Sequence, residues 1–155
     1  MTKPMRRSDR AIPESEAQRI LQAGEYGILS TVSGDGQPYG LPVSYACTGD
    51  AIYFHCALEG HKLDNLRSSN RVSFCVVGQT QVLPDRFSTN YESAIVFGQA
   101  FEVTGDEKHT GLVELLKKYS PGFIDKGLEY INHDGRKARV YKIVIKALTG
   151  KARRK

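Results

Sequence analysis

The segment from residue 53 to residue 62 carries residue types suited to binding an anion. A predicted strand ends with His55 and Cys56, a short loop follows, and a predicted helix begins at His61 and Lys62 after Gly60. The first N–H groups of a helix have no partner within it, and the helix dipole favours negative charge there. Lys62 adds a full charge and His61 a second donor. These residues suit a phosphate site, although strand–Gly–Lys–helix sequences are common and a plain capped helix with an exposed lysine is the simpler interpretation.

His55 has two interpretations. Strand alternation places it on the same face as Tyr53 and opposite Phe54. At the end of a strand it can be a hydrogen-bonded structural residue. Beside a phosphate site, its imidazole can instead donate, accept or transfer a proton to a substrate. The residues alone leave both interpretations open.

Two other stretches carry groups that a ligand could use. Pro42 lies in the run Tyr39–Tyr45 and cannot donate to a strand ladder, so this strand is predicted to be an edge or to be bulged there. The free side of an edge strand can offer backbone groups to a flat ligand. Tyr91 and Ser93 precede an apolar run and carry hydroxyls that could bind a ligand or face solvent.

The elements that position these residues are mostly strands. Apolar alternation and turn residues predict six, at 26–32, 37–46, 51–56, 71–77, 93–103 and 140–147. The first three are expected to form an antiparallel meander, because their connections are too short for crossover helices. Residues 78–90 are expected to be an irregular link. Gly98 predicts a bend or bulge, and Lys142 and Lys146 predict a half-solvated or edge position for the last strand.

Helices are predicted over 13–23, 60–69, 106–118 and 122–132, with Gly24 as a left-handed cap of the first. Antiparallel strands with helices at their margins predict a mainly β fold, a small six-stranded barrel. We expect one domain over residues 1–147, followed by a basic C-terminal tail over 148–155.

Composition limits the classes of function. The chain has 155 residues and a net charge of +5, but residues 1–134 carry 13 basic and 17 acidic side chains, whereas residues 135–155 carry 9 basic and none acidic. The positive charge is therefore concentrated at the C-terminal end, where a solvated tail is the simplest interpretation. The three cysteines are too few for a disulfide framework and show no zinc-type spacing with the histidines. With no transmembrane stretch and a charged N-terminus, the expected location is the cytoplasm.

Several of these segments together resemble a known family. They are Met5-Arg6-Arg7-Ser8-Asp9-Arg10, Tyr53 to Lys62, and Tyr91-Glu92-Ser93 leading to Val96-Phe97-Gly98. They look like the FMN-binding split barrels, in the pyridoxamine 5′-phosphate oxidase-like branch that includes the 5-nitroimidazole-resistance (Nim-type) proteins. The resemblance covers roughly residues 5 to 103 and, more loosely, the last strand.

The resemblance implies a homodimer of six-stranded split barrels with FMN at the subunit interface. By matching positions, Leu41, Pro42, Val43 and Ser44 would lie along the flavin ring, His55 and Cys56 beside the ring and ribityl chain, and His61 and Lys62 at the phosphate. Ser93 matches a flavin-contacting position and Tyr91 lies next to it, while His55 would act on the substrate side. The chain departs from the vitamin B6 oxidases at Gly40 and His61, where those enzymes carry arginine, so oxidation of vitamin B6 is not expected.

The expected function is therefore that of an FMN-dependent oxidoreductase which reduces a small electrophile such as a nitroaromatic. The alternative is a non-catalytic flavin- or haem-binding sensor or storage protein, since some split barrels bind haem or a deazaflavin. Binding of nucleic acid by the basic tail is not expected, because residues 148–155 contain no aromatic side chain.

Overall fold

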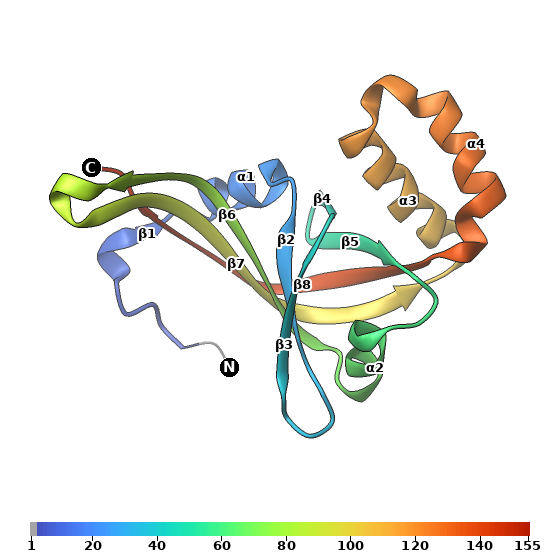
Figure 1. Cartoon of the computed structure of the whole chain (residues 1–155), viewed down its shortest axis with the longest axis horizontal. Helices are drawn as coiled ribbons and strands as arrows, with labels where there is room; N and C mark the ends of the chain where they lie inside the picture. Colours follow the sequence, from blue (N-terminus) through green and yellow to red (C-terminus); the bar gives the residue numbers. More distant parts are fainter. Residues whose placement is uncertain (1–2) are drawn as a thin grey trace.

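An antiparallel sheet organises the chain in the computed structural model, which describes residues 3–155 (Figure 1). Its eight strands are β1 (Ala11–Ile12), β2 (Gly27–Val32), β3 (Pro38–Val43), β4 (Ala46–Thr48), β5 (Ala51–Cys56), β6 (Arg71–Leu83), β7 (Ser88–Val103) and β8 (Arg139–Arg153). Seven follow the spatial order β3-β2-β6-β7-β8-β5-β4, and β1 pairs with the far end of β8. The outermost strands β3 and β4 are separated in the chain by Ser44 and Tyr45 alone, so the two margins of the sheet meet there.

Four α-helices flank the sheet: α1 (Glu14–Ala23), α2 (His61–Ser68), α3 (Gly105–Tyr119) and α4 (Ile124–Asp134). Helix α1 packs on β7 and β8, α2 packs on β2, and α3 packs on β4, β5 and β8. Helix α4 packs mainly on α3. In Figure 1, α2 and the α3–α4 pair lie at one end of the sheet, whereas the tip of the β6–β7 hairpin and the C-terminus lie at the other.

The core follows from strand alternation. In β2, residues Gly27, Leu29 and Thr31 are buried while their neighbours are half-buried. The largest fully buried side chains include Tyr45, Phe54 and Phe74. Tyr45 meets Phe74 edge to face with 4.9 Å between ring centroids, and its hydroxyl donates to the backbone oxygen of Leu21. Residue 45 thus fixes the junction of β3 and β4 to both the core and α1.

Much of the predicted architecture is confirmed. The sheet is antiparallel, helices flank it, and the four predicted helices lie within three residues of their expected bounds. Strand β3 pairs only with β2 in the described chain, so Pro42 does lie on an edge strand. The register between β7 and β8 shifts between Phe97 and Gly98, as expected for a bulge. A Cβ at Gly98 would collide with the backbone oxygen of Val144.

Two predictions about the strands are wrong. The strand expected over 37–46 is two strands, because the chain turns at Ser44 and Tyr45 from pairing with β2 to pairing with β5. Residues 78–90 are not an irregular link, since β6 and β7 continue as a hairpin to a turn at Pro84–Arg86. This hairpin extends beyond the core, so its residues are mostly exposed and lack the apolar alternation that marks a strand.

The predicted basic tail is also wrong. Strand β8 continues through Arg153, pairing with β7 and with β1, so most of residues 148–155 belong to the sheet. Of the two positions predicted for the last strand, the half-solvated one is confirmed, since Lys142 is half-buried and Lys146 exposed, whereas β8 is not an edge strand because it lies between β7 and β5. Gly24 is extended rather than left-handed. It is needed for space instead, because a Cβ there would lie 2.5 Å from the Tyr45 hydroxyl.

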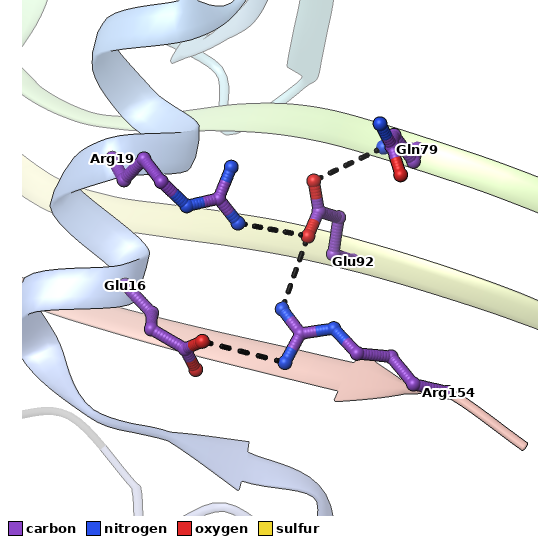
Figure 2. Close-up of polar contacts among 5 residues, drawn as sticks. All are labelled: Glu16, Arg19, Gln79, Glu92 and Arg154. Atoms are coloured by element: carbon purple, nitrogen blue, oxygen red, sulfur yellow. Dashed lines mark hydrogen bonds and ion pairs between the residues drawn. The ribbon is translucent and has the colours of Figure 1, made fainter.

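A buried carboxylate ties the end of β8 to the rest of the fold (Figure 2). Glu92, with 11% of its side chain exposed, accepts hydrogen bonds from Arg19 and Arg154 at 3.1 Å each and from the backbone N–H of Gln79 at 3.3 Å. Burial acts to raise the pKa of Glu92, but these donors outweigh it and the pKa is lowered. Arg154 also reaches Glu16 on α1 at 3.5 Å. This network holds α1, β6, β7 and β8 together.

The helices of residues 3–155 are each too short or too polar to span a bilayer.

Candidate functional site

Helix α2 begins with unsatisfied donors. Gly60 is its N-cap, no side chain caps it, and the backbone oxygen of Gly60 accepts from Leu63 and Asp64 at 3.1 and 3.2 Å. The amides of His61 and Lys62 lie too early in the helix to bond within it. Gly60 has φ 151° and ψ 172°, a region that only glycine adopts readily, and a Cβ there would meet open space. The helix start therefore presents N–H groups and the Lys62 charge to an open approach.

Two contacts fix α2 against the edge of the sheet. The ring of His61 stacks on that of Tyr39 in β3, with centroids 4.0 Å apart and planes inclined by 23°. On the inner side, the amide of the buried Asn65 donates to the Thr31 hydroxyl of β2 at 3.0 Å, and that hydroxyl donates to the Tyr39 backbone oxygen at 3.3 Å. The buried amide of Asn65 thus has a hydrogen-bond partner in the core. This contact fixes α2 against β2 and β3.

His55 and Cys56 end β5 just before this helix. Alternation along β5 buries Phe54 and Cys56 and leaves His55 exposed, opposite Val140 of β8. Loss of part of its hydration lowers the pKa of the His55 imidazole, and the nearby positive charge of Lys62 lowers it further. Burial raises the pKa of the Cys56 thiol, and Lys62 opposes that shift. Lys62 is therefore close enough to act electrostatically on both residues.

His55 and Ser44 also line a cavity of about 780 Å³ between the barrel and the α3–α4 pair. Most of the remaining lining comes from the two helices and the turn between them, with aromatic side chains at Tyr119, Phe123 and Tyr130. A volume of this size lies within the range that holds a small organic ligand. His55 contributes its imidazole to this wall and lies a few residues before the donors at the start of α2.

The edge strand β3 presents its residues in two ways. Val43 is buried and Leu41 packs against the core, so their side chains are committed to the fold. Pro42 and Ser44 are exposed. A ligand lying along this edge would therefore meet the backbone of Leu41 and Val43 and the outward groups of Pro42 and Ser44.

Tyr91 and Ser93 are not close to these residues within one chain. His55 pairs with Val140, and Val140 pairs with Val103 at the end of β7. Ser93 is ten residues earlier along β7, about 33 Å at the usual rise of a strand. Figure 1 places that part of β7 toward the end of the sheet opposite α2. The predicted site residues thus form two groups: 41–44, 55–56 and 61–62 at one end, and Tyr91 with Ser93 away from them.

A comparison with known families decides what kind of barrel this is. A family model described as pyridoxamine 5′-phosphate oxidase matches residues 13–152, nearly the whole chain. The chain belongs to the pyridoxamine 5′-phosphate oxidase family. Members of this family typically bind flavin, and the split-barrel fold expected from the sequence is confirmed.

One curated protein is similar to part of this chain. An uncharacterized protein of Rhizobium meliloti (strain 1021) is 29% identical over 94 residues, which cover 61% of this chain and 57% of that protein. The chain therefore matches somewhat more than half the length of this curated relative. Pyridoxamine 5′-phosphate oxidase family membership thus rests on the family model, which covers more of the chain.

Solved structures share the fold at low sequence identity. A candidate 5-nitroimidazole antibiotic resistance protein from Bacteroides thetaiotaomicron has a TM-score of 0.75 and 21% identity, covering 92% of this chain and 86% of its own. An FAD-binding protein from Mesorhizobium loti has a TM-score of 0.68 and 22% identity, covering 94% and 98%. A flavocytochrome from Azotobacter vinelandii has a TM-score of 0.79 and 18% identity, covering 99% and 74%. At these identities the likeness concerns the fold.

The donor set of this family member fits a flavin phosphate. The uncapped start of α2, the open space above Gly60 and the ammonium group of Lys62 are the chemistry that a phosphate requires. The adjoining edge of β3 has one unpaired side within the described sheet. A phosphate at α2 and a flat ring along β3 are thus compatible with the residues present.

Sequence reasoning missed two features of this site. Tyr39 stacks on His61, yet nothing in the sequence relates a β3 residue to one 22 positions later in a helix. The aromatic side chains of α3, α4 and the turn between them also line the cavity at His55. The available signal was the amphipathic sequence of α4. In the structure none of its residues is buried, so its apolar side is not covered by the core.

Proposed function

We propose that this pyridoxamine 5′-phosphate oxidase family member binds FMN and is an oxidoreductase that reduces a small electrophile such as a nitroaromatic. The observation that carries the proposal is the position of Lys62. It lies at an uncapped helix start and acts electrostatically on His55, which lines a cavity large enough for a small organic molecule. A phosphate-binding end and a substrate-sized space therefore adjoin the same imidazole.

Each group has a role that follows from its position. FMN, when bound, supplies the electron transfer that amino-acid side chains cannot provide. Lys62 and the amides at the start of α2 would hold its phosphate, and stacking on Tyr39 keeps the His61 ring beside them. The edge of β3 from Leu41 to Ser44 would lie along the ring system, and Cys56 would provide a buried apolar contact below it.

His55 would position the substrate rather than serve as a strong acid. Its pKa is lowered by burial of its surroundings and by Lys62, so the ring is neutral at pH 7. A neutral imidazole donates through one nitrogen and accepts through the other. The aromatic side chains of the α3–α4 wall would exclude water and favour a flat, apolar substrate.

We also propose that the active form is a homodimer with FMN at the subunit interface. The outer face of the sheet exposes Val77, Ile95 and Phe97, with 59%, 39% and 42% of each residue accessible. A second copy covering this face would bury them. Tyr91 and Ser93 lie on the same outer face. Because they are far from the start of α2 in their own chain, they would approach the flavin bound by the other subunit of the dimer.

The alternative is a non-catalytic flavin- or haem-binding sensor or storage protein. The observation that favours it is the exposed and neutral imidazole of His55, because neutral histidine is a common axial ligand of haem iron. The similarity to a flavocytochrome fold is consistent with either cofactor.

The visible absorption spectrum of the purified protein, with mass spectrometry of the cofactor released by heat, separates these proposals. The two bands of an oxidised flavin and the mass of FMN support the first. A Soret band that disappears in His55→Ala supports haem binding. A protein that is colourless and cannot be loaded with FMN contradicts both flavin proposals.

A further inference from the structure

The C-terminal half of β8 places cations beside hydroxyls on the outer face of the sheet. In the register of β7 and β8, Tyr91 pairs with Arg153 and Ser93 pairs with Lys151. Residues that pair directly across strands share a face, and this is the face opposite the buried Glu92. Arg10 ends the short helix before β1 and precedes Ala11, which also pairs with Lys151.

The two faces of the strands differ in how their charged side chains are paired. On the inner face, Glu92 and Glu16 are paired with Arg19 and Arg154, as Figure 2 shows. On the outer face, the cations Arg10, Lys151 and Arg153 make no ion pair with a carboxylate of residues 3–155. Positive charge is therefore neutralised on one side of the strands and not on the other.

Two polar side chains beside these cations, Asp9 and Asn90, already have partners. Asp9 is held by a two-pronged contact with Arg7, at 2.8 and 2.6 Å. Arg153 donates to the side-chain oxygen of Asn90 at 2.9 Å, which is a neutral partner that orients the guanidinium without cancelling its charge. Lys151 and Arg153 belong to a paired strand, so their backbone positions are fixed, unlike those of a solvated tail.

Two small hollows lie beside Arg10, Tyr91 and Arg153, and Arg153 and Arg154 line both of them. One, of about 270 Å³, is lined by Arg7, Asp9, Arg10, Ala152, Arg153, Arg154 and Lys155. The other, of about 250 Å³, includes Tyr91 and Asn90 and also Glu92, whose carboxylate is already paired with Arg19 and Arg154. Each is smaller than the usual pocket of a drug-sized ligand, so a small ion or a single ligand group fits it better.

The local field also acts on Tyr91. Partial burial works to raise the pKa of its phenol, but Arg10 and Lys151 outweigh burial and lower it. The Tyr91 hydroxyl therefore lies in a positive environment and is a stronger hydrogen-bond donor than an isolated phenol.

We propose that this outer face binds a phosphoryl group, with Arg10, Lys151 and Arg153 as cationic partners and the hydroxyls of Tyr91 and Ser93 as further donors. A phosphate offers several acceptor oxygens and two negative charges, which match converging cations and hydroxyls better than a carboxylate does. This site is distinct from the start of α2 within one chain, and its existence does not depend on the proposed oxidoreductase activity.

The experiment is calorimetric titration of the full-length protein with inorganic pyrophosphate at constant ionic strength. Lys151→Gln is expected to weaken binding by about tenfold or more, since it removes a hydrogen bond to a charged group. Lys151→Arg should retain most of it. The matched control is Lys146→Gln, which removes the same charge from an exposed position of the same strand and should change binding by less than about twofold. Absence of binding, or equal losses in both glutamine variants, overturns the proposal.

A second pair of titrations identifies the source of the phosphoryl group. If it belongs to the flavin of a second copy, saturating FMN abolishes pyrophosphate binding and Lys151→Gln weakens FMN but not riboflavin. If it belongs to a separate nucleotide, pyrophosphate still binds the FMN-saturated protein, and a nicotinamide nucleotide phosphate displaces it. Each result supports the site and assigns its ligand. Thermal unfolding of each variant, followed by circular dichroism, confirms that the folded protein is being compared.

Discussion

The imidazole of His61 stacks on the ring of Tyr39, with 4.0 Å between their centroids. This contact joins the start of α2 to the edge strand β3, the two elements that would hold opposite ends of a flavin. The Asn65–Thr31–Tyr39 hydrogen bonds brace the same junction from inside the core. The distance between the phosphate donors and the flat edge of β3 is therefore set by packing, not by the loop that precedes the helix.

Replacing Tyr39 tests whether that stack matters for ligand binding. Tyr39→Leu should weaken FMN binding severalfold, because an aromatic pair contributes about 0.5–1.5 kcal/mol beyond buried area. Tyr39→Phe keeps the ring and should bind FMN like the wild type. Fluorescence titration of FMN measures both. Equal affinities in the leucine and phenylalanine variants would show that the stack has no part in binding.

Lys62→Gln should reduce FMN affinity by about tenfold to a hundredfold, because hydrogen bonds to charged groups contribute about 1.5–3 kcal/mol. Riboflavin, which lacks the phosphate, should bind both proteins equally. Lys117→Gln, on the exposed surface of α3, is the control for loss of one positive charge. A parallel loss of riboflavin binding would mean that Lys62 supports the fold of the site instead of contacting a phosphate.

Gly60→Ala should strain the start of α2. The φ of 151° is costly for any residue with a Cβ, about 1–3 kcal/mol, even though the added atom would meet open space. Gly122→Ala is a matched control, because its Cβ also meets nothing but its backbone has no such φ. Urea unfolding should show the loss for Gly60→Ala alone, accompanied by weaker FMN binding. Equal stability of the two variants would contradict this account of Gly60.

The sequence was informative wherever one residue type carried a local rule. Pro42 predicted an edge strand, Gly98 predicted a bulge, and Gly60 with Lys62 predicted a helix start suited to an anion. Each prediction depends on backbone chemistry that neighbours in sequence determine. The grouping of residues 41–44 with 55–56 and 61–62 followed from the family resemblance, and the fold places them at one end of the sheet.

Predictions failed where tertiary contacts replaced the expected pattern. The hairpin beyond Val77 leaves the core and exposes polar residues together with Val82 and Phe87, so alternation could not reveal it. The end of β8 pairs small residues inward, with Gly150 against Ala17 of α1, and its charged residues resemble a tail in the sequence. What fixes it is Glu92, a carboxylate 62 residues earlier that accepts a hydrogen bond from Arg154. Such a pairing has no local signature.

The pH dependence of activity should report His55. Its pKa is lowered from the usual value of 6.5, so the neutral ring persists to below that pH and becomes protonated only in more acidic solution. We expect kcat/KM for a nitroaromatic to be constant around neutral pH and to fall as the pH drops through this lowered pKa. His55→Gln should be slower throughout and lose this acidic limb. An unchanged profile in the variant would assign the titration to another group.

The pH dependence of stability should report Glu92. Its pKa in the folded protein is lowered from 4.5, so the stabilisation it provides is present above about pH 4.5 and is lost as the pH falls through the folded value. Glu92→Gln keeps the shape but not the charge that receives Arg19 and Arg154. The variant should be less stable at pH 7 by about 1.5–3 kcal/mol, the range for hydrogen bonds to charged groups. Urea unfolding across pH should show the two proteins converging in acid. The exposed Glu59→Gln is the control, and a difference between Glu92→Gln and wild type that stays constant with pH would place the effect in packing instead of charge.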